Sequence, residues 1–500
     1  MVRCVLVLAG TLAASLVGIS QPATKPAGMK FQVKIAANQV GKAPESGRLL
    51  VGIGPADSEP DFTNYRPPVL PILGIDVDGF SDDKSITLDG SSDMFPVGGL
   101  EKLPAGDYTV QAIFATNRDI NLPHAPGNRY CTAVKLKLDP TAGTTVTLTL
   151  DKSFALQETE PKETATHKYL RIPSKLLSDF HGRPMVYRVG VVLPQAFEKE
   201  PEKRYGLVVD IGGFGTRYTH ASEIQPDSRF VQIVPDGAGP YGDPYHVDSA
   251  NNGPYGAAFT TEVIPHIEKT YRCLGTGKSR FTTGASTGGW VSLALQIFYP
   301  DFFNGCWSQC PDSVTFERYE LVNLYADTNA YVNRFGVERP ATRTLDGDTV
   351  STVRHECQLE TVLGRGGKWQ LSGRDWASWN ATYGPKGKDG LPVPVWDGKT
   401  GTIDKTAVEH WKKYDLKLVL TNNWKELGPK LSGGKINVWV GDSDDYFLNA
   451  AVRLFKDATD KLNNPKFDGT ILIEARKGHD SGGWTRKQIL DAMAERAGLK

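Results

Sequence analysis

The stretch FTTGASTGGW, residues 281–290, decides how the second half of this chain folds. It sets Ser286 two residues from a glycine on either side, in the pattern Gly-x-Ser-x-Gly. A sharp turn of this composition between a strand and a helix can expose a serine hydroxyl as a nucleophile. The chain contains 52 glycines, so the pattern alone is weak and its flanking residues must decide.

Both flanks predict the strand and the helix that such a turn requires. RFTT, residues 280–283, is a short β-branched and aromatic run. The apolar residues that follow share one helical face: Trp290, Leu293, Ala294, Ile297 and Phe298. Gly284, Gly288 and Gly289 would allow the strand and the helix to approach closely at the turn.

A serine hydroxyl needs a base, and the base needs an acid that orients it. His479 follows the strand-like TILIEA (470–475) in a glycine-flanked loop, and we predict that it is the base. Asp444, after the strand-like INVWV, is the preferred acid. The alternative acids are Asp445, Asp442 and Asp312, and the aspartates near 444 could instead cap the following helix.

An oxyanion on the acyl carbon needs preorganised N–H donors. We expect one from the backbone of Thr287, at the start of the predicted helix. The second would come from Gly213 or Phe214 in DIGGFG, after the strand YGLVVDI (205–211). The chain order Ser286, Asp444, His479 is the order found in α/β-hydrolases.

The chain divides by its hydrophobic pattern. Residues 27–155 carry short alternating runs separated by turn residues and predict an all-β, immunoglobulin-like sandwich whose polar residues form no catalytic constellation. Residues 156–166 read as a linker. Residues 167–500 alternate strands with helices and predict a largely parallel sheet, interrupted by an inserted cap at about 312–430. Six tryptophans of the insertion could form its own core or line the site.

The motifs RVGVVLP, YGLVVDIGGFG, VPDG, NGPYG, IPHIEKTYR, GASTGGW, GDSDDYFLN and GHD follow one another in an order that resembles an esterase family of α/β-hydrolases. Its members include esterase D-like, feruloyl esterase-like and enterochelin esterase-like proteins. The resemblance covers residues 167–310 and 433–500. It implies that Ser286 is the nucleophile, Asp444 the acid, His479 the base, and that GGFG carries an oxyanion donor. The chain departs from the family at Ile211, often a histidine, and in the long insertion.

Composition limits the partners and the compartment. Lysine plus arginine equals aspartate plus glutamate, 57 each, which does not favour nucleic acid. Residues 1–20 predict a signal peptide, hence a secreted or periplasmic protein, and no later run predicts a membrane span. Five cysteines remain, which allows at most two disulfides, and we expect buried side chains with one structural disulfide or none: Cys131, Cys273, Cys306, Cys310 and Cys357. No motif indicates a metal or a cofactor, and the oligomeric state is not fixed.

Three functions fit these observations. The first is a secreted hydrolase of carboxylic esters, with a small-molecule, carbohydrate or phenolic ester as substrate. The second is a serine peptidase of the same fold, which would cleave peptide amides as well. The third is a secreted binding module without activity; the three filled triad positions argue against it.

Overall fold

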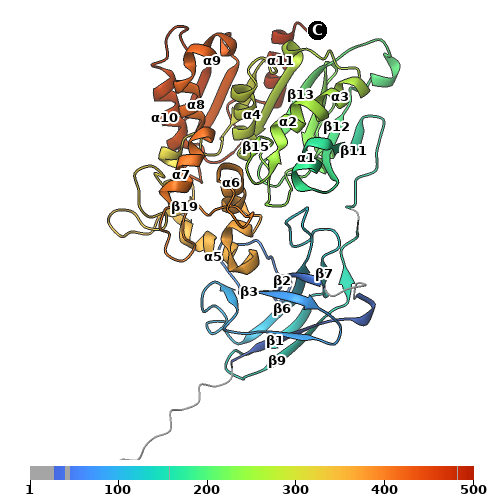
Figure 1. The fold of residues 1–500 in the computed structure, drawn as a ribbon, viewed down its shortest axis with the longest axis vertical. Coiled ribbons are helices and arrows are strands. Elements are labelled where there is room, and N and C mark those ends of the chain that lie inside the picture. Colours follow the sequence, from blue (N-terminus) through green and yellow to red (C-terminus); the bar gives the residue numbers. More distant parts are fainter. Residues whose placement is uncertain (1–27, 40–44, 157, 481, 500) are drawn as a thin grey trace, which may run out of the picture.

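The computed structural model describes residues 28–39, 45–156, 158–480 and 482–499. The predicted signal peptide, residues 1–20, lies outside these ranges. An all-β domain and an α/β domain lie at opposite ends of the molecule, and part of the insertion lies between them (Figure 1). Within the described ranges, no helix is both long and apolar enough to cross a membrane.

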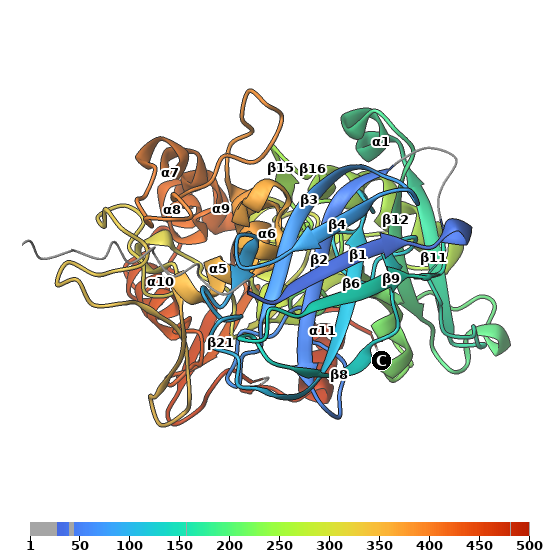
Figure 2. The same ribbon diagram turned by 90° about the horizontal axis from the view of Figure 1, so that it is seen from below.

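The all-β domain consists of two sheets that share one core (Figure 2). The smaller sheet has the order β4 (Ser85–Leu88), β1 (Lys30–Ile35), β9 (Thr145–Leu150). The larger has the order β10 (Lys152–Ser153), β7 (Arg129–Tyr130), β6 (Gly106–Ala115), β2 (Glu45–Pro55), β3 (Ile72–Phe80), β5 (Asp93–Phe95), with β8 (Val134–Leu138) also paired to β6. Phe31 and Val33 of β1 pack with Leu49 and Val51 of β2, because alternate side chains of a strand share a face.

The α/β domain is built on one eight-stranded sheet. Its order is β11 (His167–Ser174), β12 (Met185–Val192), β14 (Phe230–Pro235), β13 (Gly206–Ile211), β17 (Arg280–Ala285), β18 (Cys306–Gln309), β21 (Ile436–Gly441), β22 (Thr470–Glu474). The pairs from β14 to β22 are parallel, and β12 is antiparallel to both of its neighbours, β11 and β14. This is the α/β-hydrolase architecture predicted from the sequence.

Helices cover both faces of this sheet, which explains why every residue of the central strands β14 and β18 is buried. Leu207 and Val209 of β13 face the core beneath α3 and α4, whereas Val208 faces α11. The helices are α1 (Lys175–His181), α2 (Tyr255–Ala258), a π-helical turn (Phe259–Val263), α3 (Ile264–Thr270), α4 (Thr287–Phe298), α10 (Asn449–Thr459) and α11 (Arg486–Ala497). A short hairpin, β15 (Asp248–Ser249) and β16 (Gly253–Pro254), precedes α2.

The insertion occupies residues 310–435, between β18 and β21. It contains β19 (Pro340–Arg343), β20 (Thr349–Thr352), α5 (Val353–Leu363), α6 (Asp375–Tyr383), α7 (Lys405–Trp411), α8 (Leu416–Asn422) and α9 (Trp424–Leu431). All six of its tryptophans join the core of the α/β domain instead of forming a separate one. Tyr383 makes the connection, since its ring centroid lies 5.1 Å from that of Trp290 and 5.2 Å from that of Trp411.

The all-β domain docks on helix α5 of the insertion. Leu50 and Phe95 pack against Val362 in a small apolar cluster on the outer face of the larger sheet. Arg48, with its side chain 3% exposed, donates to the carbonyl of Val362 (2.9 Å) and pairs with Asp76 (3.1 Å) and Asp93. An apolar patch with a buried cation at its edge therefore joins the two domains.

Two smaller predictions can be compared with the structure. Residues 156–166 form no helix or strand where they are described, as expected of a linker, but Glu158 pairs with Arg217 and Glu160 pairs with Arg171 of the α/β domain. The five cysteines predicted to remain in the mature chain are buried, and none of these five is in a disulfide.

Candidate active site

Ser286 lies at the turn between β17 and α4, in a backbone conformation that is rare for a residue with a side chain. Its φ is 58° and its ψ is −124°. Such a conformation costs on the order of 1–3 kcal/mol and persists only where the surroundings impose it. The flanking glycines permit the tight turn, because a Cβ on Gly284 or Gly288 would lie 2.4 or 2.0 Å from the Ile211 carbonyl oxygen. The predicted close approach of strand and helix is confirmed.

His479 and Asp444 form a hydrogen-bonded pair at the ends of the last two strands. His479 Nδ1 lies 2.8 Å from Asp444 Oδ2, and the Asp444 side chain is 0% exposed. The other oxygen of Asp444 accepts from the backbone N–H groups of Tyr446 and Leu448. Burial lowers the pKa of His479, but hydrogen bonds with Asp444 and Cys310 outweigh burial and raise it above its usual value. The imidazole is thus held in one orientation and its charged form is stabilised.

The three alternative acids occupy different places. Asp445 accepts from the backbone N–H of His479 (3.2 Å), and it supports the loop without touching the ring. Asp442 accepts from Ser443 and from the backbone of Arg476 (2.8 Å). Neither caps α10, whose first turn has no side-chain cap. Of the three aspartates at 442, 444 and 445, Asp444 is therefore the one whose side chain contacts the imidazole.

Asp312 lies beside the nucleophile instead of the histidine. Ser286 Oγ is 3.5 Å from Asp312 Oδ1, a long contact, and within the described residues the hydroxyl makes no hydrogen bond to His479. The second oxygen of Asp312 accepts from Tyr245, Thr287 (3.0 Å) and Trp379 (3.0 Å). Burial raises the pKa of the Asp312 carboxyl, and these hydrogen bonds partly oppose it.

The predicted oxyanion donors line the same cavity as Ser286. Thr287 is the first residue of α4, where backbone N–H groups have no partner within the helix. Gly213 faces the turn, since a side chain there would lie 3.9 Å from Cβ of Ser286. Phe214 follows, with its ring 5.6 Å from the Arg374 guanidinium. Thr287, Gly213 and Phe214 therefore lie around Ser286 in one cavity.

The cavity at Ser286 has a volume of about 300 Å³ and takes residues from all three parts of the chain. The all-β domain contributes Tyr65, which no motif in the sequence indicated as a site residue. Its backbone carbonyl accepts from His355 of α5 (3.2 Å), and Arg66 beside it donates to the Tyr446 hydroxyl (3.3 Å). The Tyr446 ring in turn packs edge-on against His479, with centroids 4.8 Å apart. The all-β domain therefore contributes to the cavity, although its polar residues form no catalytic constellation in the sequence.

The insertion contributes further carboxyl groups that sequence reasoning missed. Glu320, Glu356 and Asp375 line the cavity together with Trp379. Burial raises the pKa of Glu356 to about 7 and raises the pKa of Glu320 and of Asp375 as well. No periodicity or motif surrounds these residues, so only the packing of the insertion brings them to Ser286.

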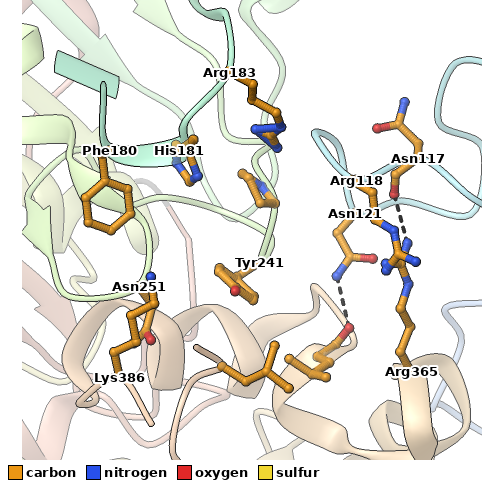
Figure 3. A pocket seen from close by; sticks show the side chains of 13 residues that line it. Asn117, Arg118, Asn121, Phe180, His181, Arg183, Tyr241, Asn251, Arg365 and Lys386 are labelled. Atoms are coloured by element: carbon orange, nitrogen blue, oxygen red, sulfur yellow. Dashed lines mark hydrogen bonds between the residues drawn. The ribbon is translucent and has the colours of Figure 1, made fainter. Parts of the chain in front are cut away.

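A second cavity, of about 340 Å³, lies where the all-β domain, the α/β domain and the insertion meet (Figure 3). Its charged residues are mostly basic: Arg118, Arg183, Arg365, Lys386 and, when protonated, His181. Asn121 and Arg365 cross the domain boundary with hydrogen bonds to Leu371 O (3.0 Å) and Asn117 O (3.2 Å). No carboxyl group is among the described residues that line it.

Residues 184–467 match the family model described as "Putative esterase". A ferulic acid esterase is 16% identical, with 66% of this chain and 96% of that chain covered and a TM-score of 0.35. The Staphylococcus aureus fluorophosphonate-binding serine hydrolase F is 14% identical (66% and 98% covered, TM-score 0.38). An S-formylglutathione hydrolase from Agrobacterium tumefaciens is 13% identical (68% and 99% covered, TM-score 0.36). The search of curated proteins found no match.

Proposed function

The chain belongs to the esterase family whose model spans residues 184–467, and on that premise we propose that it cleaves carboxylic esters through an acyl-enzyme on Ser286. The observation that carries this proposal is the strained turn at Ser286 in one cavity with the His479–Asp444 pair. A nucleophile, a base and an orienting acid are the minimum set for acyl transfer by serine.

In the proposed reaction, Ser286 Oγ attacks the ester carbonyl and His479 takes the hydroxyl proton. Asp444 holds the imidazole through Nδ1 and stabilises its charged form. The backbone N–H of Thr287 and that of Gly213 or Phe214 stabilise the oxyanion. Protonated His479 then gives its proton to the leaving alcohol, and water releases the acyl group by the same steps in reverse order.

The attack requires the serine hydroxyl to turn from Asp312 toward His479. A rotation about χ1 of one staggered well changes the direction of Oγ without moving the backbone. Catalytic hydrogen bonds are often long in the absence of substrate and tighten only when it binds. We propose that Asp312 holds the hydroxyl before substrate binds, and that an acyl group bound at the oxyanion donors favours the rotamer facing His479.

A fluorophosphonate probe tests the nucleophile directly. The wild-type protein is expected to be labelled and to hydrolyse p-nitrophenyl acetate, and Ser286→Ala to do neither. Ser292→Ala is the matched control, because this serine is buried in the same helix and its hydroxyl bonds the Gly289 carbonyl. Equal labelling of wild type and Ser286→Ala would refute the assignment. Turnover of a peptide amide alone would favour the peptidase, and absence of labelling would favour a binding module.

Export is also proposed, on the sequence of residues 1–20 alone. Fractionation of cells that express the full chain, with a variant lacking residues 2–20 as the control, is expected to find the full-length product outside the cytoplasm and the shortened product inside it. Equal retention of both products would refute the proposal.

A further inference from the structure

The cavity at Ser286 holds an excess of acidic groups with little basic charge to balance them. Four carboxyl groups line it, those of Asp312, Glu320, Glu356 and Asp375, and His479 is the one basic side chain among its lining residues. Since His479 is already paired with Asp444, its charge does not offset these groups. Arg374 reaches Asp375 from the side at 3.6 Å.

Two of the carboxyl groups are satisfied by the protein. Asp312 accepts three hydrogen bonds at one oxygen, and Glu356 accepts from the Ser351 hydroxyl and from Trp376 Nε1 (2.9 Å). Such groups are held by the surrounding network and have little capacity left for a ligand.

Glu320 is different. It is 1% exposed, and its Oε2 is buried without a hydrogen-bond partner within the described part of the chain. Its φ of 50° is unusual for a residue with a side chain, and its N–H donates to the Ser313 hydroxyl (2.9 Å), which fixes the backbone there. A buried polar group without a partner costs stability, so its presence calls for an explanation such as an absent ligand.

Asp375 and the aromatic rings complete a surface suited to a cation. The Asp375 side chain lines the cavity and is 35% exposed, so it can contact a molecule bound there. Tyr65, Phe214, Trp379 and Tyr446 surround the same space. Aromatic faces attract ammonium groups, and a buried carboxyl group without a partner gains most from an opposite charge. Within the described residues, no three acidic, imidazole or thiol groups are grouped as a metal site would need.

We propose that the substrate carries an ammonium group, and that Glu320 and Asp375 select it. This inference rests on the proposed function. The ester bond would lie over Ser286, and the cationic part of the acyl or alcohol half would enter the acidic side of the cavity. The volume of about 300 Å³ is at the small end of ligand pockets and fits a compact cation of choline or amino-acyl size.

Pairs of esters that differ only in charge test the proposal. Acetylcholine and 3,3-dimethylbutyl acetate differ in the alcohol half, and the p-nitrophenyl esters of 4-(trimethylammonio)butyrate and 5,5-dimethylhexanoate differ in the acyl half. In the pair whose charged half enters the acidic side of the cavity, kcat/KM is expected to be about 10-fold or more higher for the cation. The reason is that the ammonium group gains an ion pair and contacts with aromatic rings. A ratio at or below one in both pairs would overturn the proposal.

Glu320→Gln keeps the shape of the side chain and removes its charge. It is expected to lower kcat/KM for the favoured cation about 10-fold or more and to change the neutral partner by less than about 3-fold. Glu317→Gln is the control, because this residue is on the same segment and pairs with Lys417 outside the cavity. Equal losses on both esters would contradict the assignment. If Glu320→Gln does not fold, Asp375→Asn offers the same test at a partly exposed position.

Binding without turnover separates this inference from the proposed function. Ser286→Ala is titrated with butyltrimethylammonium by calorimetry. The neutral control is 5,5-dimethylhexan-1-ol, which has the same branched carbon skeleton without the positive charge and carries a hydroxyl group. Binding of the cation that Glu320→Gln abolishes would support the inference even if no ester were cleaved. Ester turnover without such binding would retain the function and refute the inference. Displacement of the cation by Mg²⁺ or Ca²⁺ at millimolar concentration would overturn the assignment to an organic cation.

Discussion

The cavity at Ser286 and the second, basic cavity contain opposite charges in different surroundings. At Ser286 the carboxyl groups are largely enclosed, and burial raises the pKa of Asp312, Glu320 and Glu356. In the second cavity the cations keep contact with solvent, and Arg118 and Lys386 are exposed. A buried charge depends on each hydrogen bond it makes, whereas an exposed charge is screened by water and salt. Substitutions should therefore matter far more in the first cavity.

Both cavities nevertheless depend on the same docking of domains. The all-β domain supplies Tyr65 to the first, and Asn117, Arg118 and Asn121 to the second. Helix α5 of the insertion holds this domain through the contact with Arg48. Loosening that junction should perturb both cavities together, which distinguishes it from any change made within one of them.

The largest effect is expected at Asp444. Asp444→Ala should lower kcat on p-nitrophenyl acetate by about 10⁴-fold, because the imidazole loses the bond that fixes its orientation. Asp445→Ala is the neighbouring control and should cost at least about 100-fold less, since it contacts only the backbone of His479. Steady-state kinetics on both variants, with circular dichroism to confirm folding, makes the comparison. Similar losses in the two variants would mean that the loop, and not the ion pair, is critical.

The pH dependence tests the same pair. His479 can accept a proton only when neutral, and the structure raises its pKa above the usual value of about 6.5. Activity should therefore fall as pH decreases through an acid limb that lies above about 6.5. Asp444→Asn removes the negative charge and should move this limb down by about one pH unit or more. The measurement is kcat/KM against pH for both proteins. An unchanged limb would assign it to another group.

Protonation of His479 has opposite effects on the stability of the fold and on activity. A group whose pKa is higher in the folded state stabilises the fold fully below its unfolded pKa, and this contribution is lost as pH rises through the folded pKa. Protonated His479 thus stabilises the empty enzyme at low pH, where catalysis is weakest.

The next largest effect is expected on stability, at the junction between the all-β domain and helix α5. Arg48→Met should lower the free energy of unfolding by about 1–3 kcal/mol, because the Val362 carbonyl and two carboxylates lose their shared cation. Arg453→Met, at an exposed position of α10, is the matched control. Urea denaturation gives the free energies, and ligand titrations show whether both cavities weaken. Equal destabilisation by the two substitutions would indicate that the contacts of Arg48 at the domain junction add no more to stability than an exposed arginine does.

Much of the fold was predictable because strand and helix periods are local. The strands before Ser286, Asp444 and His479 are short apolar runs, and the carboxyl ends of neighbouring parallel strands meet at one edge of a sheet. Ser286 and Asp444, more than 150 positions apart in the chain, were therefore expected to lie close together. The turn at Ser286 was predictable for a different reason: its glycines are required by clashes with the Ile211 carbonyl.

The rest could not be read from the sequence because it depends on tertiary packing. Tyr65 belongs to an irregular segment of the all-β domain, and it reaches the cavity only because that domain docks on α5. Glu320 lies in the insertion, where no period links it to Ser286. The tryptophans of the insertion had two possible roles in the sequence; the structure buries all six in the main core, and Trp379 also lines the cavity.

The smallest effect is expected in the second cavity. Arg118→Gln combined with Lys386→Gln should leave kcat/KM on p-nitrophenyl acetate within about 2-fold, because both side chains are exposed and their fields are screened beyond about 8–10 Å at moderate salt. Asp375→Asn is the counterpart in the first cavity and should alter the discrimination between charged and neutral esters. The comparison is made at low and at high ionic strength. A large loss of kcat/KM in the double variant at low salt that disappears at high salt would show that the basic cavity influences the acidic one through its electric field. The two cavities would then not be independent.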